Sequence, residues 1–435
     1  MKTFKISVLL ITILCLPFSA TFAARIEISA PGEQTIPLAM TRLLPMGVGA
    51  AQPAVAAEFQ QVLLGDLDLS GLFDMVDPAA FLGDADKLGL RRNDIDFNQW
   101  RMLGSEALIK GGYSVTAGKL TIELRLFDVI TQRLLTGRRY VGKLTDVRKI
   151  AHTFADQILK SLTGEKGPFA SKIAYISKRT GYKELYLMDV DGHHPIQMTK
   201  HRSIVLNPDF SPIRKELIFT SYSKENPDLY RKEVYTGRES RLSLKPGLNI
   251  GGRYSPDGHE IALTLSKDKN SEIYLLGTDG TIHRRLTNHY SIDVDPSWSP
   301  KGNRIAFVSD RRGNPNIFIV DVYSRDVTRL TFEGKYNATP AWSPKGDKIA
   351  YSRMDNGVFN IFTIREDGTD ERQLTFGKGS KEHPRWSPDG RFLIYSNDLN
   401  GGEKSIWIMR ADGTGNRKIS SRGGNDSHPA WSDRW

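Results

Sequence analysis

Six residues of very different chemistry stand three positions before a recurring aromatic residue in the C-terminal part of the chain. They are Asn207, Gly251, Asp295, Thr339, His383 and His428. Histidine and aspartate can ligate a transition metal or exchange protons with a substrate. A Ca²⁺ ion held by carboxylates and carbonyls is another kind of site that such residues allow. Which of these kinds of site the six residues could form depends on the strands and turns that position them.

The aromatic residues that follow these positions mark a repeat. They are Phe210, Tyr254, Trp298, Trp342, Trp386 and Trp431, so the step is 44 residues four times and then 45. A fixed period of this length is the signature of a repeat architecture. In the unit from Ala341, the sequence "SPKG" predicts a tight turn, and three short runs follow it: 349–351, 359–364 and 373–375. Four short strands per unit are typical of one β-propeller blade.

The number of blades follows from counting the second strand of each unit. That strand occurs six times, from "KIAYIS" at Lys172 to "FLIYS" at Phe392. The first unit lacks an aromatic-Ser-Pro strand before it, and the final strand, "HPAWSDRW", has nothing after it. We therefore predict an all-β six-bladed propeller over residues 168–435, closed by the C-terminal strand, which removes an open sheet edge.

Symmetry places the six variable residues in one ring where the central channel opens. Asp295 is then three blades from His428, across the channel, which argues against a transition-metal site. "DVDGHH" from Asp189 lacks the later ligands of a Ca²⁺ loop and fits a hairpin turn. A ring whose residues vary among the blades, five residue types at six positions, is free to serve a partner. The predicted partner-binding rim comprises Asn207, Leu248, Gly251, Asp293, Asp295, Thr339, His383 and His428, with no catalytic residue and no metal ligand.

The first 23 residues predict a secretory signal peptide. Lys2 and Lys5 precede an apolar run, and small residues lead to expected cleavage after Ala23. Cys15, the single cysteine, lies inside this segment, so the mature protein is expected to have neither a thiol nor a lipid anchor. No later stretch reaches the ~20 apolar residues of a membrane span.

The formal net charge is +10, but Lys and Arg are scattered through turns, so we expect solubilising charge or an acidic partner rather than nucleic acid.

Residues 41–167 lack the repeat and predict a separate α/β domain. "KLTIELRLFDV" from Lys119 alternates apolar and polar residues as a half-buried strand does, and strands on either side of it suggest a meander. Residues 144–164 place apolar residues on one helical stripe, so this helix is expected to cover the sheet. Residues 24–40 predict an extended segment that either binds another sheet or forms an edge strand of its own domain.

The chain resembles a known family, TolB, the periplasmic component of the Tol-Pal system of Gram-negative envelopes. The resemblance rests on "SGLFDMVDP" from Ser70, "RLFDVITQRLLTGRRY" from Arg125, the "SPDG" blades and, most specifically, the junction from Arg148 to Ser177. It covers the signal, the N-terminal segment, the α/β domain and the propeller in the same order.

The resemblance implies a non-enzymatic periplasmic adaptor without a cofactor, a monomer within a multiprotein complex. Its propeller would bind Pal, a peptidoglycan-associated lipoprotein, and its N-terminal segment, at Arg25, Ile26, Glu27 and Ile28, would bind TolA. Other periplasmic or outer-membrane proteins are further expected partners. Pal occupancy would change whether the N-terminal segment is docked or free, and the role would be outer-membrane integrity and constriction at cell division. A secreted lyase or peptidase-like enzyme acting in the channel is the alternative, although the chain has no G-x-S-x-G nucleophile elbow.

Overall fold

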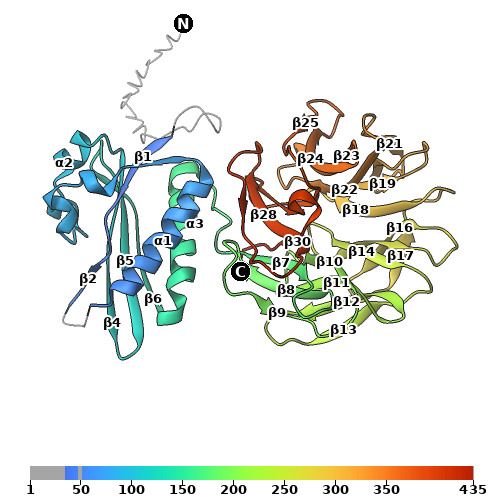
Figure 1. Cartoon of the computed structure of the whole chain (residues 1–435), viewed down its shortest axis with the longest axis horizontal. Coiled ribbons are helices and arrows are strands. Elements are labelled where there is room, and N and C mark those ends of the chain that lie inside the picture. Colours follow the sequence, from blue (N-terminus) through green and yellow to red (C-terminus); the bar gives the residue numbers. More distant parts are fainter. Residues whose placement is uncertain (1–34, 48–50, 435) are drawn as a thin grey trace, which may run out of the picture.

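The computed structural model describes residues 35–47 and 51–434. An α/β domain lies beside a six-bladed propeller, as Figure 1 shows. This is the fold class predicted from the repeat and from the N-terminal patterns. The expected signal peptide, residues 1–23, lies outside the described residues.

The α/β domain is a mixed sheet in the order β3-β1-β4-β5-β6, with β2 added beside β4. Strand β1 is parallel to both of its neighbours, β3 and β4, whereas β4, β5 and β6 form an antiparallel meander. The strands are β1 (Ile36–Met40), β2 (Leu44–Pro45), β3 (Phe73–Met75), β4 (Ala107–Thr116), β5 (Lys119–Asp128) and β6 (Arg133–Lys143).

Helices α1 and α3 pack together and lie on the side of the sheet that faces the propeller (Figure 1). The apolar stripe predicted for α3 is buried, from Val147 to Leu162. Both helices end at a glycine in the left-handed conformation, Gly71 and Gly164, as helix C-termini often do. The helices are α1 (Pro53–Ser70), α2 (Phe97–Met102) and α3 (Val147–Thr163), with 3₁₀ turns at Pro78–Ala80, Gly83–Asp86, Arg92–Asp94, Leu144–Asp146 and Leu399–Gly401.

Residues Ile36–Met40, which belong to the predicted extended N-terminal segment, form an inner strand of this sheet. Leu38, Ala39 and Met40 are buried, and β1 pairs with β3 on one side and β4 on the other. The domain therefore begins before residue 40, because an inner strand cannot leave the sheet without exposing both of its neighbours.

Each propeller blade is a four-stranded antiparallel sheet, and five blades are continuous in sequence. They are β10 (Val205–Phe210), β11 (Glu216–Lys224), β12 (Asn226–Glu233) and β13 (Glu239–Ser243); β14 (Asn249–Tyr254), β15 (Glu260–Leu265), β16 (Glu272–Gly277) and β17 (Ile282–Arg285); β18 (Asp293–Trp298), β19 (Arg304–Ser309), β20 (Asn316–Asp321) and β21 (Val327–Arg329); β22 (Tyr336–Trp342), β23 (Lys348–Asp355), β24 (Val358–Arg365) and β25 (Arg372–Gln373); β26 (Lys381–Trp386), β27 (Phe392–Asn397), β28 (Ser405–Arg410) and β29 (Arg417–Lys418).

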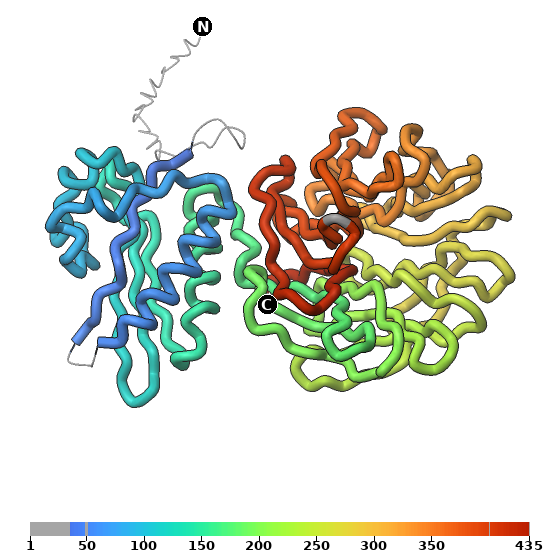
Figure 2. The backbone as a smooth tube through the Cα atoms, in the orientation of Figure 1, coloured from blue at the N-terminus to red at the C-terminus, as the bar shows by residue number. Residues whose placement is uncertain are grey.

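The remaining blade joins the two ends of the propeller. Its order is β30-β7-β8-β9, with β7 (Lys172–Ser177), β8 (Glu184–Asp189), β9 (Ile196–Gln197) and β30 (Ser427–Trp431). Figure 2 shows the red C-terminal tube beside the green first strands. Trp431 Nε1 donates to Ser171 Oγ at 2.7 Å, and Ser432 N donates to Lys172 O at 2.9 Å. The closure predicted from the unmatched strands is confirmed.

A threonine just after the fourth strand recurs in four blades, preceded by leucine in three of them and by methionine in the other. In these blades its hydroxyl accepts a backbone N–H of the third strand, at 2.8 to 3.0 Å, and so ties the outermost strand to its neighbour. The pairs are Leu185 to Thr199, Ile273 to Thr287, Ile317 to Thr331 and Ile361 to Thr375.

Candidate functional site

The six variable residues occupy the same structural position in every blade. Each lies in the innermost strand at a bulge, where two residues of that strand lie opposite one residue of its partner. All six have positive φ, between 48° and 69°. A bulge of this kind bends the strand and redirects a side chain. The ring members are Asn207, Gly251, Asp295, Thr339, His383 and His428.

The ring surrounds one end of the channel. All of its members except Gly251 line a cavity of about 140 Å³ there. A Cβ added to Gly251 would lie 3.5 Å from Asp295 Oδ1 and 3.9 Å from Asn207 Nδ2, so the glycine belongs to the same ring. The ring arrangement predicted from the repeat is thus observed, whereas its role in partner binding stays a prediction.

His383 and His428 lie against each other in this ring, with ring centroids 3.9 Å apart. Burial lowers the pKa of His383 to about 4 and lowers the pKa of His428 well below its ordinary value. Two neutral imidazoles can stack, whereas two charged ones would repel. At neutral pH this side of the ring is therefore uncharged and offers flat aromatic surface.

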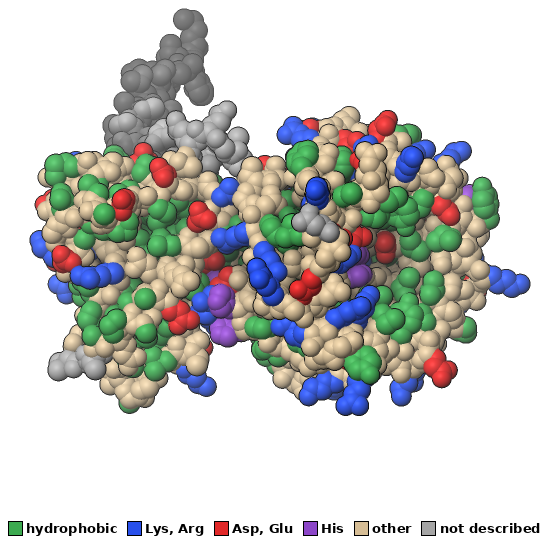
Figure 3. Space-filling model, in the orientation of Figure 1, with side chains coloured by type: hydrophobic (Ala, Val, Ile, Leu, Met, Phe, Trp, Pro, Cys, Tyr) green, Lys and Arg blue, Asp and Glu red, His purple; other side chains and the backbone are tan. Residues whose placement is uncertain are grey.

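Exposed apolar side chains stand in the loops that lead from an outermost strand into the innermost strand of the next blade. Tyr290 is 86% exposed, Phe376 70% and Phe332 68%. Ile204, Leu244 and Ile292 are further exposed members of this set, which we call the apolar rim. Figure 3 shows a hollow in the propeller with histidine and acidic side chains inside it and hydrophobic side chains around it. A large apolar rim around a polar centre is typical of a protein-binding surface.

Two residues of the partner-binding rim predicted from the sequence, Asp293 and Leu248, are not members of the ring. Asp293 is fully buried, and its carboxylate pairs with Arg311 Nη2 at 2.7 Å. Asp293, at the start of β18, therefore has no exposed surface in this structure, unlike the rim position predicted for it. Leu248 is partly exposed and its N–H donates to Ser266 Oγ at 2.8 Å, which fixes the loop before β14. Arg25, Ile26, Glu27 and Ile28 lie outside the described residues.

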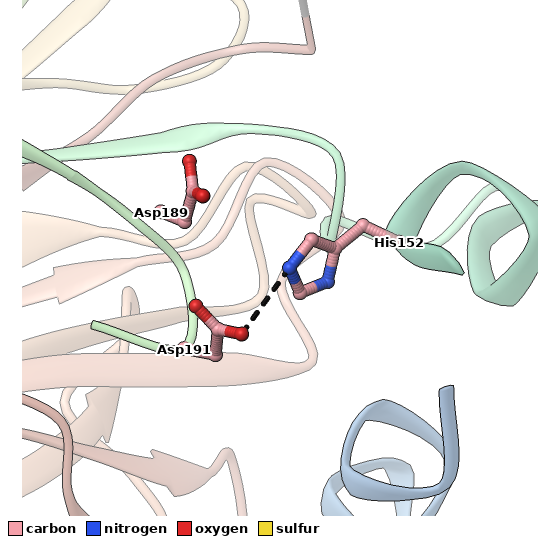
Figure 4. A group of neighbouring side chains, drawn as sticks. All are labelled: His152, Asp189 and Asp191. Carbon is pink, nitrogen blue, oxygen red and sulfur yellow. Dashed lines mark ion pairs between the residues drawn. The ribbon is translucent and has the colours of Figure 1, made fainter. Parts of the chain in front are cut away.

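A second polar cluster joins the two domains and was missed by sequence reasoning. His152 of α3 bonds Asp66 Oδ2 of α1 through Nδ1 at 2.7 Å, and its Nε2 lies 3.3 Å from Asp191 Oδ2 in the β8–β9 turn. Arg148, one helical turn before His152, also pairs with Asp191. Figure 4 shows His152 pointing from its helix toward Asp191. Arg148 and His152 are four positions apart in a predicted helix, and this spacing could have placed both on one face of that helix.

The charges of this cluster explain its pKa shifts. Burial alone would lower the pKa of His152, but the carboxylates of Asp66 and Asp191 raise it to about 10. Burial acts against ionised Asp191, yet the close ion pair with His152 and the charge of Arg148 hold its pKa well below the usual range. A charged imidazolium between carboxylates from the two domains is thus favoured over a neutral one.

His152, Asp189 and Asp191 form the group of possible metal ligands found among the described residues, with ligand atoms within 4.8 Å of one another. Two cations already neutralise its carboxylates, because Lys172 pairs with Asp189 and Arg148 pairs with Asp191. We therefore interpret this group as an ionic contact between domains. The expected hairpin turn of "DVDGHH" is present, with Gly192 at φ 88°.

A six-bladed propeller fixed to an α/β domain defines a class of two-domain propeller proteins. The family model described as TolB amino-terminal domain matches residues 24–135, and that described as TolB beta propeller domain matches residues 159–434. The chain belongs to the TolB family.

Individual relatives agree with this assignment. A protein of Syntrophotalea carbinolica named Tol-Pal system protein TolB is 61% identical over 210 residues, 48% of each chain. One of the same name from Desulfosudis oleivorans is 41% identical over 57% of this chain and 56% of that one. The chain thus spans about half the length of the curated relatives it matches. The crystal structure of TolB from Acinetobacter baumannii has a TM-score of 0.79 at 26% identity, over 94% of this chain and 99% of that one.

No helix in the described part of the chain is both long and apolar enough to cross a membrane.

Proposed function

We propose that this chain is a periplasmic, non-enzymatic adaptor of the Tol-Pal system. In this proposal the ring and the apolar rim bind Pal, and residues 25–28 bind TolA, so that the protein supports outer-membrane integrity and constriction at division. Membership of the TolB family and the names of the curated relatives support this proposal.

The observation that carries the proposal is the chemistry of the channel mouth. Phe332, Phe376 and Tyr290 offer the apolar contact area that a protein interface buries, and the ring offers polar groups at its centre. The ring also varies from blade to blade while the packing aromatics beneath it hardly vary. A surface that serves recognition rather than packing is expected to show this contrast.

The apolar rim can be tested with a matched pair of variants. The double variant Phe332→Asp and Phe376→Asp places charges on the rim, whereas Tyr323→Asp changes an equally exposed aromatic in the β20–β21 turn, at the opposite face. We expect the double variant to bind purified Pal at least tenfold more weakly in surface plasmon resonance and Tyr323→Asp to bind normally. Equal binding by both variants would contradict the proposed Pal surface.

The N-terminal assignment needs a deletion that spares β1. Removal of residues 24–34 leaves Ile36–Met40 in the sheet, whereas a deletion extending to residue 39 would remove most of an inner strand. We expect the shorter deletion to abolish capture of TolA from an envelope extract and to leave Pal capture unchanged. Retained TolA would refute the assignment to residues 25–28, and turnover of a polysaccharide or peptide by the purified chain would refute the non-enzymatic role.

A further inference from the structure

The channel continues from the ring to a second mouth at the opposite face. A funnel of about 340 Å³ opens there, and aromatic-Ser-Pro segments of several blades line it. Two residues, Arg253 and Arg385, line both this funnel and the ring cavity. The passage between the two cavities, which we call the waist, is therefore lined by two guanidinium side chains.

In each blade, the residue directly before the recurring aromatic lies at the level of the waist, as Arg253 and Arg385 do. At this level Asp209 accepts Tyr254 N and Ser297 accepts Trp342 N, both at 2.9 Å, so these side chains are engaged with the next blade. The blades on either side of Arg385 carry Ala341 and Ala430 at this position. Arg385 thus has short neighbours at its own level, which leaves room for a ligand.

Neither arginine has an acidic partner within 4.0 Å among the described residues. Arg385 Nη1 donates to Pro384 O at 2.9 Å, and its buried Nε has no partner. Arg253 Nη1 donates to backbone carbonyls alone, those of Gly252, Pro208 and Asn207, at 3.0 to 3.5 Å. A buried donor without a partner is costly, so a bound acceptor at Arg385 would stabilise the site.

The carboxylates near the waist determine how much negative charge a ligand must carry to balance the two arginines. Asp209 and Asp295 interact electrostatically with Arg253, but burial raises the pKa of Asp209 to about 6 and also raises that of Asp295. Arg253 is therefore partly balanced and Arg385 is not. A single negative charge suits this balance better than a dianion such as phosphate.

We propose that Arg385, assisted by Arg253, forms a carboxylate-binding site at the waist of the channel. The planar guanidinium of Arg385 donates N–H groups to a carboxylate from the side that lines the cavity, where no acidic side chain pairs with it. The carboxylate comes either from an acidic side chain of a segment inserted through a channel mouth or from a small organic acid. The site stands independently of the proposed Tol-Pal function, because it needs no particular partner.

The test is a titration of the full chain, followed by the ¹⁵N and ¹H shifts of arginine Nε–H groups. The probes are propionate, phosphate, and the blocked tripeptides acetyl-Gly-Glu-Gly-amide and acetyl-Gly-Gln-Gly-amide. We expect saturable shifts with propionate and with the glutamate peptide, and none with the glutamine peptide. Saturation by propionate alone would support the site with small acids as its ligands, whereas preference for phosphate or no saturable shift would overturn the proposal.

Variants separate specific binding from general charge. Arg385→Gln removes the guanidinium, Arg385→Lys keeps the charge without the planar pair of donors, and Arg312→Gln removes an exposed arginine of the β19–β20 turn. We expect Kd for the carboxylate probe to rise at least tenfold in Arg385→Gln, to rise less in Arg385→Lys and to stay unchanged in Arg312→Gln. Equal weakening by Arg312→Gln would overturn the proposal. If Arg385→Gln does not fold, Arg253→Gln and the wild-type shifts decide the question.

Discussion

Thr339 has a backbone conformation that β-branched residues rarely adopt. Its φ is 50°, in the left-handed region, and its hydroxyl lies 2.8 Å from Ser352 Oγ. The homologous positions hold Asn207, Asp295 and Gly251, which tolerate this conformation better. The bulge imposes the same backbone conformation on every blade, so the conformational strain depends on which residue occupies the position.

This strain can be measured with two substitutions at position 339. Thr339→Gly and Thr339→Ala both lose the hydroxyl contact, but glycine alone accepts positive φ without strain. We expect Thr339→Gly to be more stable than Thr339→Ala by about 1 kcal/mol in urea unfolding. The same pair at Thr328, within β21, is the control, and there alanine should be the more stable variant. Greater stability of alanine at position 339 would contradict the strain argument.

His152 predicts a pH dependence of stability. Its pKa in the folded protein, about 10, is above the ordinary value of 6.5. Its stabilising contribution is therefore complete below pH 6.5 and is lost as pH rises toward 10. We expect the free energy of unfolding to fall over this range, and His152→Gln to remove that part of the slope and cost about 3 kcal/mol at pH 6.5. His259→Gln, at an exposed position, should leave the slope as it is; an unchanged slope in His152→Gln would refute the assignment.

At the scale of the elements, the repeat made the blades and their closure predictable from sequence. Each strand has a recurring signal, such as the Ser-Pro turn before the second strand, and the unmatched first and last units required each other. Ring membership followed from the same register. Burial inside a blade did not, which is why Asp293, two positions before Asp295, was assigned to the surface.

Strand β1 shows why the boundary of the α/β domain was harder to predict. Residues 24–40 were predicted to add to another sheet or to form an edge strand, and Pro37 speaks against an inner strand because proline cannot donate to a neighbouring strand. The structure accommodates Pro37, whose carbonyl accepts Glu106 N at 2.9 Å while Ile36 N and Val76 N form the bonds to the β3 side. No local pattern in the sequence encodes parallel pairing with strands more than 30 residues away.

Strand β30 allows a test of ring closure by substitution. Trp431 packs near Phe392 and donates to Ser171, so Trp431→Ala removes both contacts. We expect a loss of about 2 to 4 kcal/mol in unfolding free energy, since Trp431 is partly buried. Trp431→Phe keeps the aromatic ring and loses only the hydrogen bond, so its cost should be about 1 kcal/mol. A loss below 1 kcal/mol in Trp431→Ala would show that closure does not depend on this residue.

At the scale of the whole molecule, the two domains share a continuous interface. One hydrophobic cluster contains Phe154 and Leu159 of α3 together with Tyr186 and Phe392 of the propeller. Arg410 donates to the carbonyls of Asp68 and Leu69 at the C-terminus of α1, where a cation is favourable. Such contacts between distant segments carry no repeat or periodicity, so the interface could not be predicted from the sequence.

The shared interface predicts cooperative unfolding. We expect a single calorimetric transition for the wild type, because neither domain can unfold without exposing this cluster. The double variant Asp191→Asn and Arg410→Ala removes the ionic contact and the α1 cap, and should split or broaden the transition. Arg422→Ala, at an exposed position, is the control. Two resolved transitions in the wild type would refute this coupling.

The pairing of β30 with β7 also constrains the rate at which the chain folds. Ser171 and Trp431 are 260 positions apart, so the blade that they share cannot acquire its innermost strand until both ends of the propeller have been synthesised. Contacts of such sequence separation slow folding, and an incomplete chain carries an unpaired strand edge meanwhile. Newly made molecules thus depend on protection from aggregation for as long as the last blade stays open.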